Sequence, residues 1–200
     1  CLSAAKTAPA PLGTIAEILA ARKLETRQHI FYSVTGTVRR IWGGQDFILT
    51  DETGSDSFIC YKPTMPEHGD RIHVTGSFRP PAGNWIPLGI QRYETLGKGS
   101  LACPQDITPA DVARKSVPDY SSVRIEATVD EVRPDDISSE CNFLVLKDGL
   151  DSVLVATKES EQGLSTLSEL MGSRVRITGC LYYQRSSWRQ FHSPVVIVGD

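Results

Sequence analysis

Short apolar runs separated by turn-forming residues dominate the hydrophobic pattern of this chain. Several runs alternate apolar with polar positions, so that Ile72 and Val74 are expected on one face of a strand and Arg71 and His73 on the other. The stretches 51–54 (Asp-Glu-Thr-Gly) and 147–149 (Lys-Asp-Gly) are typical of turns, because Gly permits a positive φ and Asp caps the turn locally. The pattern predicts many short antiparallel strands.

The strand pattern occurs twice in the same order. Segments 33–38, 47–54 and 68–78 are matched by segments 123–129, 143–149 and 171–181. The matches extend to single positions, because Gly-x-Arg-(Ile/Val)-x-(Val/Ile)-Thr-Gly occurs both at 69–76 and at 172–179. Three ordered matches indicate an internal duplication.

Each copy is expected to contain five strands, with a spacer between the third and the fourth. The fifth strands are predicted at Ile86–Ile90 and Val195–Val198. The spacer Glu159–Met171 has the apolar spacing of a short amphipathic helix, whereas Lys62–Pro66 is too short and Pro-rich for one. Five short strands in this arrangement match the OB-fold, a small Greek-key barrel. We therefore predict an all-β chain of two tandem five-stranded OB-type Greek-key barrels with short helices.

The predicted boundaries place a tether at 1–13, the first barrel with a leading helix at 14–100, a linker at 101–120 and the second barrel at 121–200. The leading helix is expected at Thr14–Lys23, where Ile15 and Ile18 share one apolar stripe. A similar helical turn is expected in the linker, with Thr108 as its cap and Pro109 in the first position.

Composition and charge narrow the function classes. Hydrophobic residues make up 40% of the chain and charged residues 22%, which is typical of a soluble globular protein. The net charge is −3; the first 102 residues hold 11 basic and 9 acidic residues, and the remainder 10 and 15. This balance disfavours general nucleic-acid binding, which depends on clustered Lys and Arg. No apolar run approaches the roughly 20 residues that a membrane-spanning helix needs.

The five cysteines show no C-x-x-C spacing, which leaves a zinc knuckle or a thioredoxin-like site without support. Because the number of cysteines is odd, they could all be reduced, or two of them, for example Cys141 and Cys180, could form one disulfide. Cys1 is followed by a small, Pro-rich segment. Such a start fits a bacterial lipoprotein after signal cleavage, and it equally fits a piece trimmed from a longer protein.

The motifs together resemble a known type of module. The leading helix, the Val-Thr-Gly at 34–36, the Asp-Glu-Thr-Gly at 51–54 and the Gly-Asp…Thr-Gly at 69–76 are similar to OB-type modules of bacterial extracytoplasmic regions. Such modules occur in tandem before the membrane span of certain sensor histidine kinases, and the resemblance runs from about Thr14 to Val198. It implies an extracytoplasmic (periplasmic or cell-surface) sensory module, and the Cys1 start adds a lipoprotein as the other possibility. Anticodon-binding and single-strand-binding OB domains share some of these motifs, and the second copy departs at 147–149 and 172–173.

No pattern in the sequence predicts catalysis. The four histidines His29, His68, His73 and His192 are scattered over different segments, and no nucleophile-elbow, zinc-protease or phosphate-loop motif is present. The acidic pairs at 130–131 and 135–136 lack the spacing of a calcium loop, so a solvated loop is favoured over a calcium site. We expect no enzyme activity, no cofactor and no metal.

Arginines and aromatics in the predicted loops are the candidate site. OB barrels bind mainly through the loops that join strands one to two and four to five, and aromatics beside Arg stack flat ligands. The first barrel supplies the ligand candidates Arg39, Arg40, Trp42, Arg79, Trp85 and Arg92. The second supplies candidates for a ligand, a partner or an inter-barrel interface, namely Tyr182, Tyr183, Arg185, Trp188, Arg189 and Phe191. Trp42 and Trp85 fit barrel-end core positions equally well.

The sequence favours a non-enzymatic module that binds a small molecule, a glycan or a protein. The alternative is a single-stranded nucleic-acid-binding OB protein, with nucleic acid as a possible but less favoured partner. Membrane contact is expected only through the tether or through a span outside this chain. The slightly basic first barrel is the better candidate for a flat or anionic ligand, and the second for a contact surface.

Overall fold

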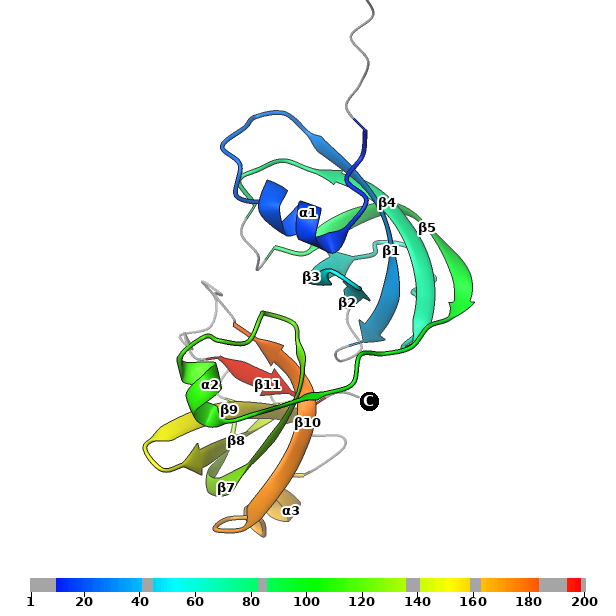
Figure 1. The fold of residues 1–200 in the computed structure, drawn as a ribbon. Helices are drawn as coiled ribbons and strands as arrows, with labels where there is room; N and C mark the ends of the chain where they lie inside the picture. The colour runs from blue at the N-terminus through cyan, green and yellow to red at the C-terminus, as the bar shows by residue number, and fades with distance from the viewer. Residues whose placement is uncertain are drawn as a thin grey trace, which may run out of the picture.

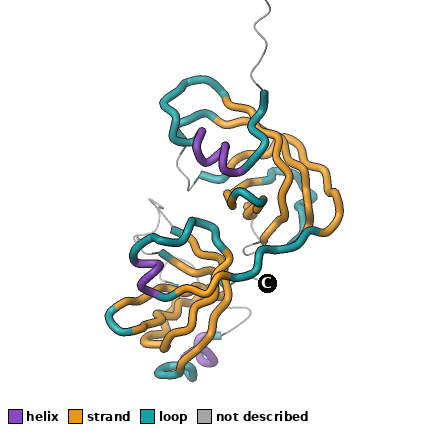
Figure 2. Tube along the Cα trace, in the orientation of Figure 1, coloured by secondary structure: helices purple, strands orange, loops and turns teal. Residues whose placement is uncertain are grey.

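The computed structural model describes residues 10–40, 45–82, 86–135, 141–158, 163–183 and 194–198. The strands form two sheets that curl separately, one from each half of the chain (Figure 1). The described helices are short and lie outside the sheets (Figure 2). The prediction of an all-β chain in two halves is confirmed.

The first barrel has the strand order of an OB-fold. Its strands follow one another around the barrel as β1-β2-β3-β5-β4, and β1 pairs with β4 to close it. The pairing of β3 with β5 is parallel, and the other pairings are antiparallel, as the Greek-key path requires. The five strands are β1 (Ile30–Arg40), β2 (Asp46–Asp51), β3 (Gly54–Ile59), β4 (Asp70–Phe78) and β5 (Leu88–Lys98).

The second barrel repeats this order. β7 pairs with β8 and β10, β8 with β9, and β11 lies between β9 and β10. The β9–β11 pairing is parallel and corresponds to the parallel β3–β5 pairing. Two tandem OB-type barrels are therefore present. The strands are β7 (Ser122–Pro134), β8 (Cys141–Asp148), β9 (Asp151–Lys158), β10 (Arg174–Tyr182) and β11 (Val195–Ile197), with an additional β6 (Gln105–Ile107) beside β7.

The duplication extends to single backbone hydrogen bonds. The N–H of Gly69 donates to the carbonyl of Val38 at 2.9 Å, and the N–H of Gly172 donates to that of Val129 at 2.8 Å. Both glycines have a positive φ, 78° and 77°, which few other residues adopt without strain. The shared Gly-x-Arg motif thus marks the turn that starts the fourth strand of each barrel.

The segments before the two barrels are also equivalent. α1 (Ile15–Ala21) begins with a capping box of Thr14 and Glu17, and α2 (Pro109–Ala113) begins with one of Thr108 and Asp111. Just before each helix the chain pairs in parallel with the first strand, through a Leu12–Tyr32 bridge in one copy and through β6 in the other. The predicted cap at Thr108 is confirmed. Within the predicted linker, β6 joins the second sheet and α2 packs against β8 and β9.

A buried ion pair holds α1 in the first barrel. Arg22, directly after α1, is 1% exposed and donates from Nε and Nη2 to the two carboxylate oxygens of Asp56, at 2.9 and 3.0 Å. Its Nη1 also donates to the carbonyl of Ile86 at 3.0 Å. β3 and β5 pair only at 58–59 and 88–89, so Arg22 joins the two sides of the barrel where their ladder is shortest. Burial raises the pKa of Asp56, and the Arg22 guanidinium opposes that shift.

Three sequence expectations differ from the structure. Ile86 is 43% exposed and precedes β5, which instead extends to Lys98 because it pairs with β4 along most of its length. Asp130 and Glu131 belong to β7 and not to a loop, because β7 continues along β8 past a register shift. In the predicted spacer helix, the described part is α3 (Leu164–Ser168), where Leu167 is buried and Met171 lies beyond the helix and is exposed.

We predict that Arg22→Met lowers the free energy of unfolding by about 3–5 kcal/mol, because it leaves the Asp56 carboxylate buried without its partner. Urea denaturation followed by circular dichroism measures the change. The matched control is Arg124→Met at the exposed Arg124–Asp106 pair, for which a loss below about 1 kcal/mol is expected. The double variant Arg22→Met/Asp56→Leu is expected to be more stable than Arg22→Met alone. Equal losses of unfolding free energy in Arg22→Met and Arg124→Met would contradict the role given to the Arg22–Asp56 pair.

Candidate functional site

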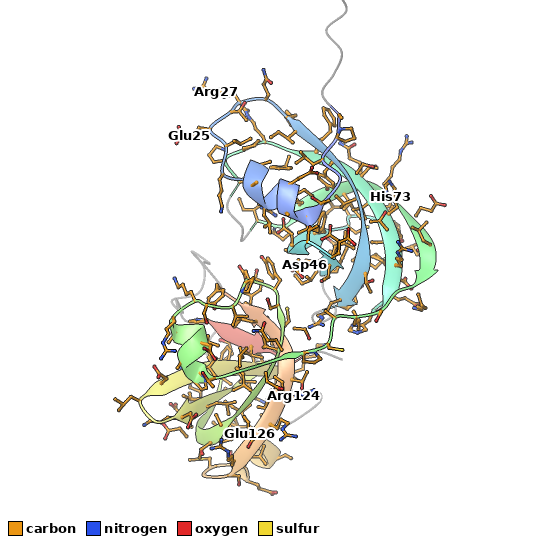
Figure 3. All side chains as sticks on the ribbon, viewed as in Figure 1. Glu25, Arg27, Asp46, His73, Arg124 and Glu126 are labelled. Atoms are coloured by element: carbon orange, nitrogen blue, oxygen red, sulfur yellow. The ribbon has the colours of Figure 1, made fainter. Side chains whose placement is uncertain are left out.

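The two barrels meet through a small apolar cluster. Ile48 points outward from β2, yet it is only 3% exposed because it packs with Tyr120 and Cys180, both 2% exposed, and with Tyr182. The Tyr120 and Tyr182 rings meet edge to face with centroids 5.1 Å apart. Asp46, at the start of β2, lies on the side of the first barrel nearest the second (Figure 3). The outer face of β2 is therefore an interface within the chain.

Tyr120 takes a strained backbone conformation to make this contact. Its φ of 62° is uncommon for a bulky residue. The Asp119 carboxylate beside it accepts the backbone N–H of Tyr120 and that of Tyr183, both at 3.0 Å. The segment before β7 is thus tied to the end of β10, and the two carry the tyrosines of the contact together.

This arrangement changes which surfaces can bind a ligand. OB barrels bind oligonucleotides on the outer face of the second and third strands. In the first barrel that face is covered at Ile48. In the second barrel the corresponding strands carry a buried apolar cluster of Cys141, Phe143, Leu154 and Ala156, with Val195 of β11. Neither face offers exposed stacking aromatics among the described residues.

A cleft of about 350 Å³ lies beside the inter-barrel contact. The first barrel contributes Arg39 and Arg40, the last two residues of β1, together with His68 before β4. The second contributes Thr178 and neighbouring residues of β10, and the connecting segment 101–104 forms a further wall. Residues from both barrels and from the connection therefore share one site.

The lining of the cleft is cationic. Among the described residues it contains two arginines and one histidine and no carboxylate. Arg39 is half-buried and forms no ion pair within the described ranges, while Arg40 donates from Nη1 to the carbonyl of Pro66 at 3.5 Å. The buried Nδ1 of His68 has no hydrogen-bond partner among the residues described. An anion in the cleft would lie beside two guanidinium groups and beside a ring nitrogen that has no hydrogen-bond partner among the described residues.

The cysteines around the site differ in reactivity. Cys60, Cys103, Cys141 and Cys180 are free thiols. Burial raises the pKa of the Cys180 thiol to about 12, and the nearby Arg39 guanidinium only partly opposes this shift. Cys103 is exposed in the connecting segment and lines the cleft. A thiol in water thus faces the site from one wall and a protonated, buried thiol from another.

The structure brings together only some of the residues expected from the sequence. Arg39 and Arg40 line the cleft, although they belong to strand β1 and not to the predicted loop. Arg79 and Arg92 are exposed and lie outside it. Tyr182 and Tyr183 are half-buried at the end of β10. Tyr182 lies at the inter-barrel contact, and Tyr183 packs against the core of the second barrel. Trp42, Trp85, Arg185, Trp188, Arg189 and Phe191 lie outside the described residues.

Sequence reasoning missed three parts of the site. His68 directly precedes the first copy of the Gly-x-Arg…Thr-Gly motif, and Thr178 lies within the second copy. The motif marks the duplication but does not indicate which surfaces of the two copies face each other. Ile48 has the pattern of an ordinary strand residue, and nothing local shows that it contacts another barrel. An apolar residue at an outward strand position was the one available signal.

Comparisons with known proteins give distant matches only. No protein-family model and no curated protein matches the chain. Among solved structures, it is similar to fission yeast Pot1 with ssDNA (TM-score 0.37, 10% identity, 90% of this chain and 82% of that one). It is also similar to a replication protein A heterotrimer bound to ssDNA (0.35, 12%, 80% and 46%) and to the Ifi202 HINa domain with 20bp dsDNA (0.35, 10%, 86% and 95%). The OB assignment rests on the strand order of the chain itself.

Metal and membrane features are absent from the described part of the chain. No group of three or more His, Cys, Asp or Glu side chains within the described ranges is placed to hold a metal ion. No described helix is long and apolar enough to cross a bilayer.

We predict that Cys103 reacts readily with a thiol reagent at about pH 8, whereas Cys180 stays unmodified because its pKa of about 12 keeps it protonated. Mass spectrometry of proteolytic peptides after timed labelling distinguishes the cysteines. Cys60, buried in the first barrel, is the internal control for global unfolding. Equal labelling rates at Cys103 and Cys180 would show that the inter-barrel contact is not formed.

We predict that Ile48→Ser opens this contact without unfolding either barrel, because the side chain points away from the first core. The expected result is labelling of Cys180 that is about tenfold faster or more, which corresponds to a loss of about 1.4 kcal/mol of contact energy. Labelling of Cys60 should not change. If both cysteines become reactive together, Ile48 supports the barrel rather than the interface.

Proposed function

We propose that this chain is a non-enzymatic binding module that holds an anionic ligand in the cleft between its two OB-type barrels. The observation that carries the proposal is the cleft lining, in which the described residues include Arg39, Arg40 and His68 but no carboxylate. A volume of about 350 Å³ lies in the range of sites for small molecules. A phosphate or carboxylate group suits two guanidinium groups best, because they donate planar pairs of hydrogen bonds.

Binding in the cleft also gives the module a means of response. A ligand held by β1 and β10 contacts both barrels at once, so its binding energy stabilises one relative placement of the barrels. This is the behaviour that a sensory module requires. The extracytoplasmic location and the signalling role implied by the sequence resemblance stay predictions, as does the absence of catalysis.

Single-stranded nucleic acid is the second candidate ligand. It is supported by the OB strand order and by Arg39 and Arg40, which end β1 where the chain enters the first loop. The covered β2 face and the net charge of −3 weigh against it. A strand would have to bind by its phosphates in the cleft and leave the usual OB face unused.

We predict that inorganic phosphate shifts backbone amide signals of β1 and β10 in 15N–1H spectra of the full chain. Arg39→Gln and Arg40→Gln are each expected to weaken this binding by about tenfold, since each removes a charged donor. Arg92→Gln is the matched control, because Arg92 is exposed on β5 outside the cleft, and it should bind as the unmodified chain does.

The same titration with an oligothymidylate separates the two candidates. Binding that is much tighter than that of phosphate, and that falls steeply as salt rises, would favour nucleic acid. Phosphate shifts that Arg39→Gln and Arg40→Gln leave unchanged would contradict the cleft as the site.

A further inference from the structure

A second cavity lies on the outer face of the first barrel. We call this cavity the groove; its volume is about 700 Å³, and it is a different cavity from the inter-barrel cleft. Hydroxyl side chains of neighbouring strands line it, and two opposite charges lie at its sides. The residues that matter here are Ser33, Thr35, Thr37, Thr50, Glu52 and Arg71.

The strand register arranges this polar surface. Arg71 of β4 is opposite Thr37 of β1, and Thr37 is opposite Thr50 of β2, so the three side chains form a row across the sheet. Glu52 follows in the turn after β2. Neighbouring strands lie about 4.8 Å apart, so the row places the two charged residues about 10 Å or more apart at the backbone.

Most polar groups of the cavity already have partners, but the two charged ends do not. Thr35 Oγ1 is 3.0 Å from His73 Nδ1, and the Thr50 and Ser55 hydroxyls are 2.8 Å apart. Arg71 and Glu52 are exposed and form no hydrogen bond or ion pair, with each other or with any other described residue. They are exposed charges of the cavity that no described residue pairs with.

The second barrel shows what the arginine lacks. Its equivalent of Arg71 is Arg174, which donates from Nε to Glu126 Oε1 at 3.0 Å. In the second barrel Arg174 is opposite Thr128, and Glu126 lies two residues before Thr128. In the first barrel Arg71 is opposite Thr37, and the residue two positions before Thr37 is Thr35. Figure 3 shows Glu126 on the outer face of the second barrel and His73, the neighbour of Thr35, on that of the first. Glu126 also accepts from Arg176, which lies directly opposite it. The first barrel therefore has the arginine but no carboxylate at the position equivalent to Glu126, where Thr35 contacts His73 instead.

We propose that this groove binds a small zwitterion, a free amino acid or a short peptide, whose carboxylate pairs with Arg71 and whose ammonium pairs with Glu52. The ligand carboxylate takes the place that the Glu126 side chain holds in the second barrel. Arg71 supplies the planar donor pair that recognises a carboxylate, and Glu52 supplies an acceptor for an ammonium group. The proposal does not depend on the anion site in the cleft.

The chemistry of the groove favours a ligand with both charges. An anion alone would leave Glu52 near it unpaired, and a cation alone would do the same to Arg71. The Asp51 carboxylate is already held by the N–H groups of Ile15, Thr53 and Gly54 and is not available. Both charged side chains are exposed, so the affinity is expected in the millimolar range.

The test uses triglycine, N-acetyl-triglycine and triglycine amide as probes for the full chain. The second lacks the ammonium group, and the third lacks the carboxylate. The expected result is amide shifts in β1, in β4 and in the turn after β2 with triglycine, and binding of either blocked peptide that is weaker by about tenfold. Equal binding of all three peptides, or no shift at millimolar triglycine, overturns the proposal.

Protein variants test each end of the groove. Arg71→Gln should bind triglycine and its amide equally, and Glu52→Gln should bind triglycine and its acetylated form equally. Thr35→Glu rebuilds the carboxylate of the second barrel, so it should pair with Arg71 and prevent triglycine from binding while the fold is retained. Arg92→Gln and Glu94→Gln, both exposed on β5 outside the groove, should bind as the unmodified chain does. A Thr35→Glu variant that binds triglycine normally contradicts the proposal.

The two sites are tested separately by one further variant. Arg39 lies in the cleft, so the Arg39→Gln variant should bind triglycine as the unmodified chain does. Phosphate binding without triglycine binding disproves only the groove, and triglycine binding without phosphate binding disproves only the cleft.

Discussion

The contact between Arg22 and Asp56 is the constraint on which the first barrel depends. The guanidinium and the carboxylate are both fully buried, and each would be costly to bury alone. Because Arg22 also donates to the carbonyl of Ile86, the pair fixes α1 against β3 and against the approach to β5. It thereby ties the residue that precedes β5 to α1 and to β3.

The barrels use equivalent strands for different purposes. The fold places an outer face on β2–β3 and another on β1–β4 of the first barrel. The second barrel covers part of the former through Tyr120 and Tyr182, and this leaves the end of β1 and the outer side of β1–β4 accessible. Both candidate sites lie on these remaining surfaces. Packing between the two copies has therefore moved the accessible polar chemistry away from the surface on which single OB barrels bind.

The sequence predicts what depends on neighbouring residues and fails where distant parts of the chain meet. The cap at Thr108 and the turns at 51–54 and 147–149 follow from local chemistry, and the duplication then gives the strand order. Ile48 could not be assigned to the interface, because an outward apolar side chain shows its purpose only when its neighbour is known. The sequence identifies Arg39 and Arg40 by residue type but predicts a loop for them, because the pattern does not show where β1 ends. The difference between Thr35 and Glu126 becomes meaningful only after the register aligns the two barrels.

The segment that connects the barrels has a consequence for the surfaces on either side of it. Leu101, Ala102 and Cys103 line both the cleft and the groove, so the two cavities share one wall. The short connection between the two barrels therefore does more than join them, because the same three residues shape both candidate binding surfaces. A substitution at any of the three would alter the lining of both cavities at once.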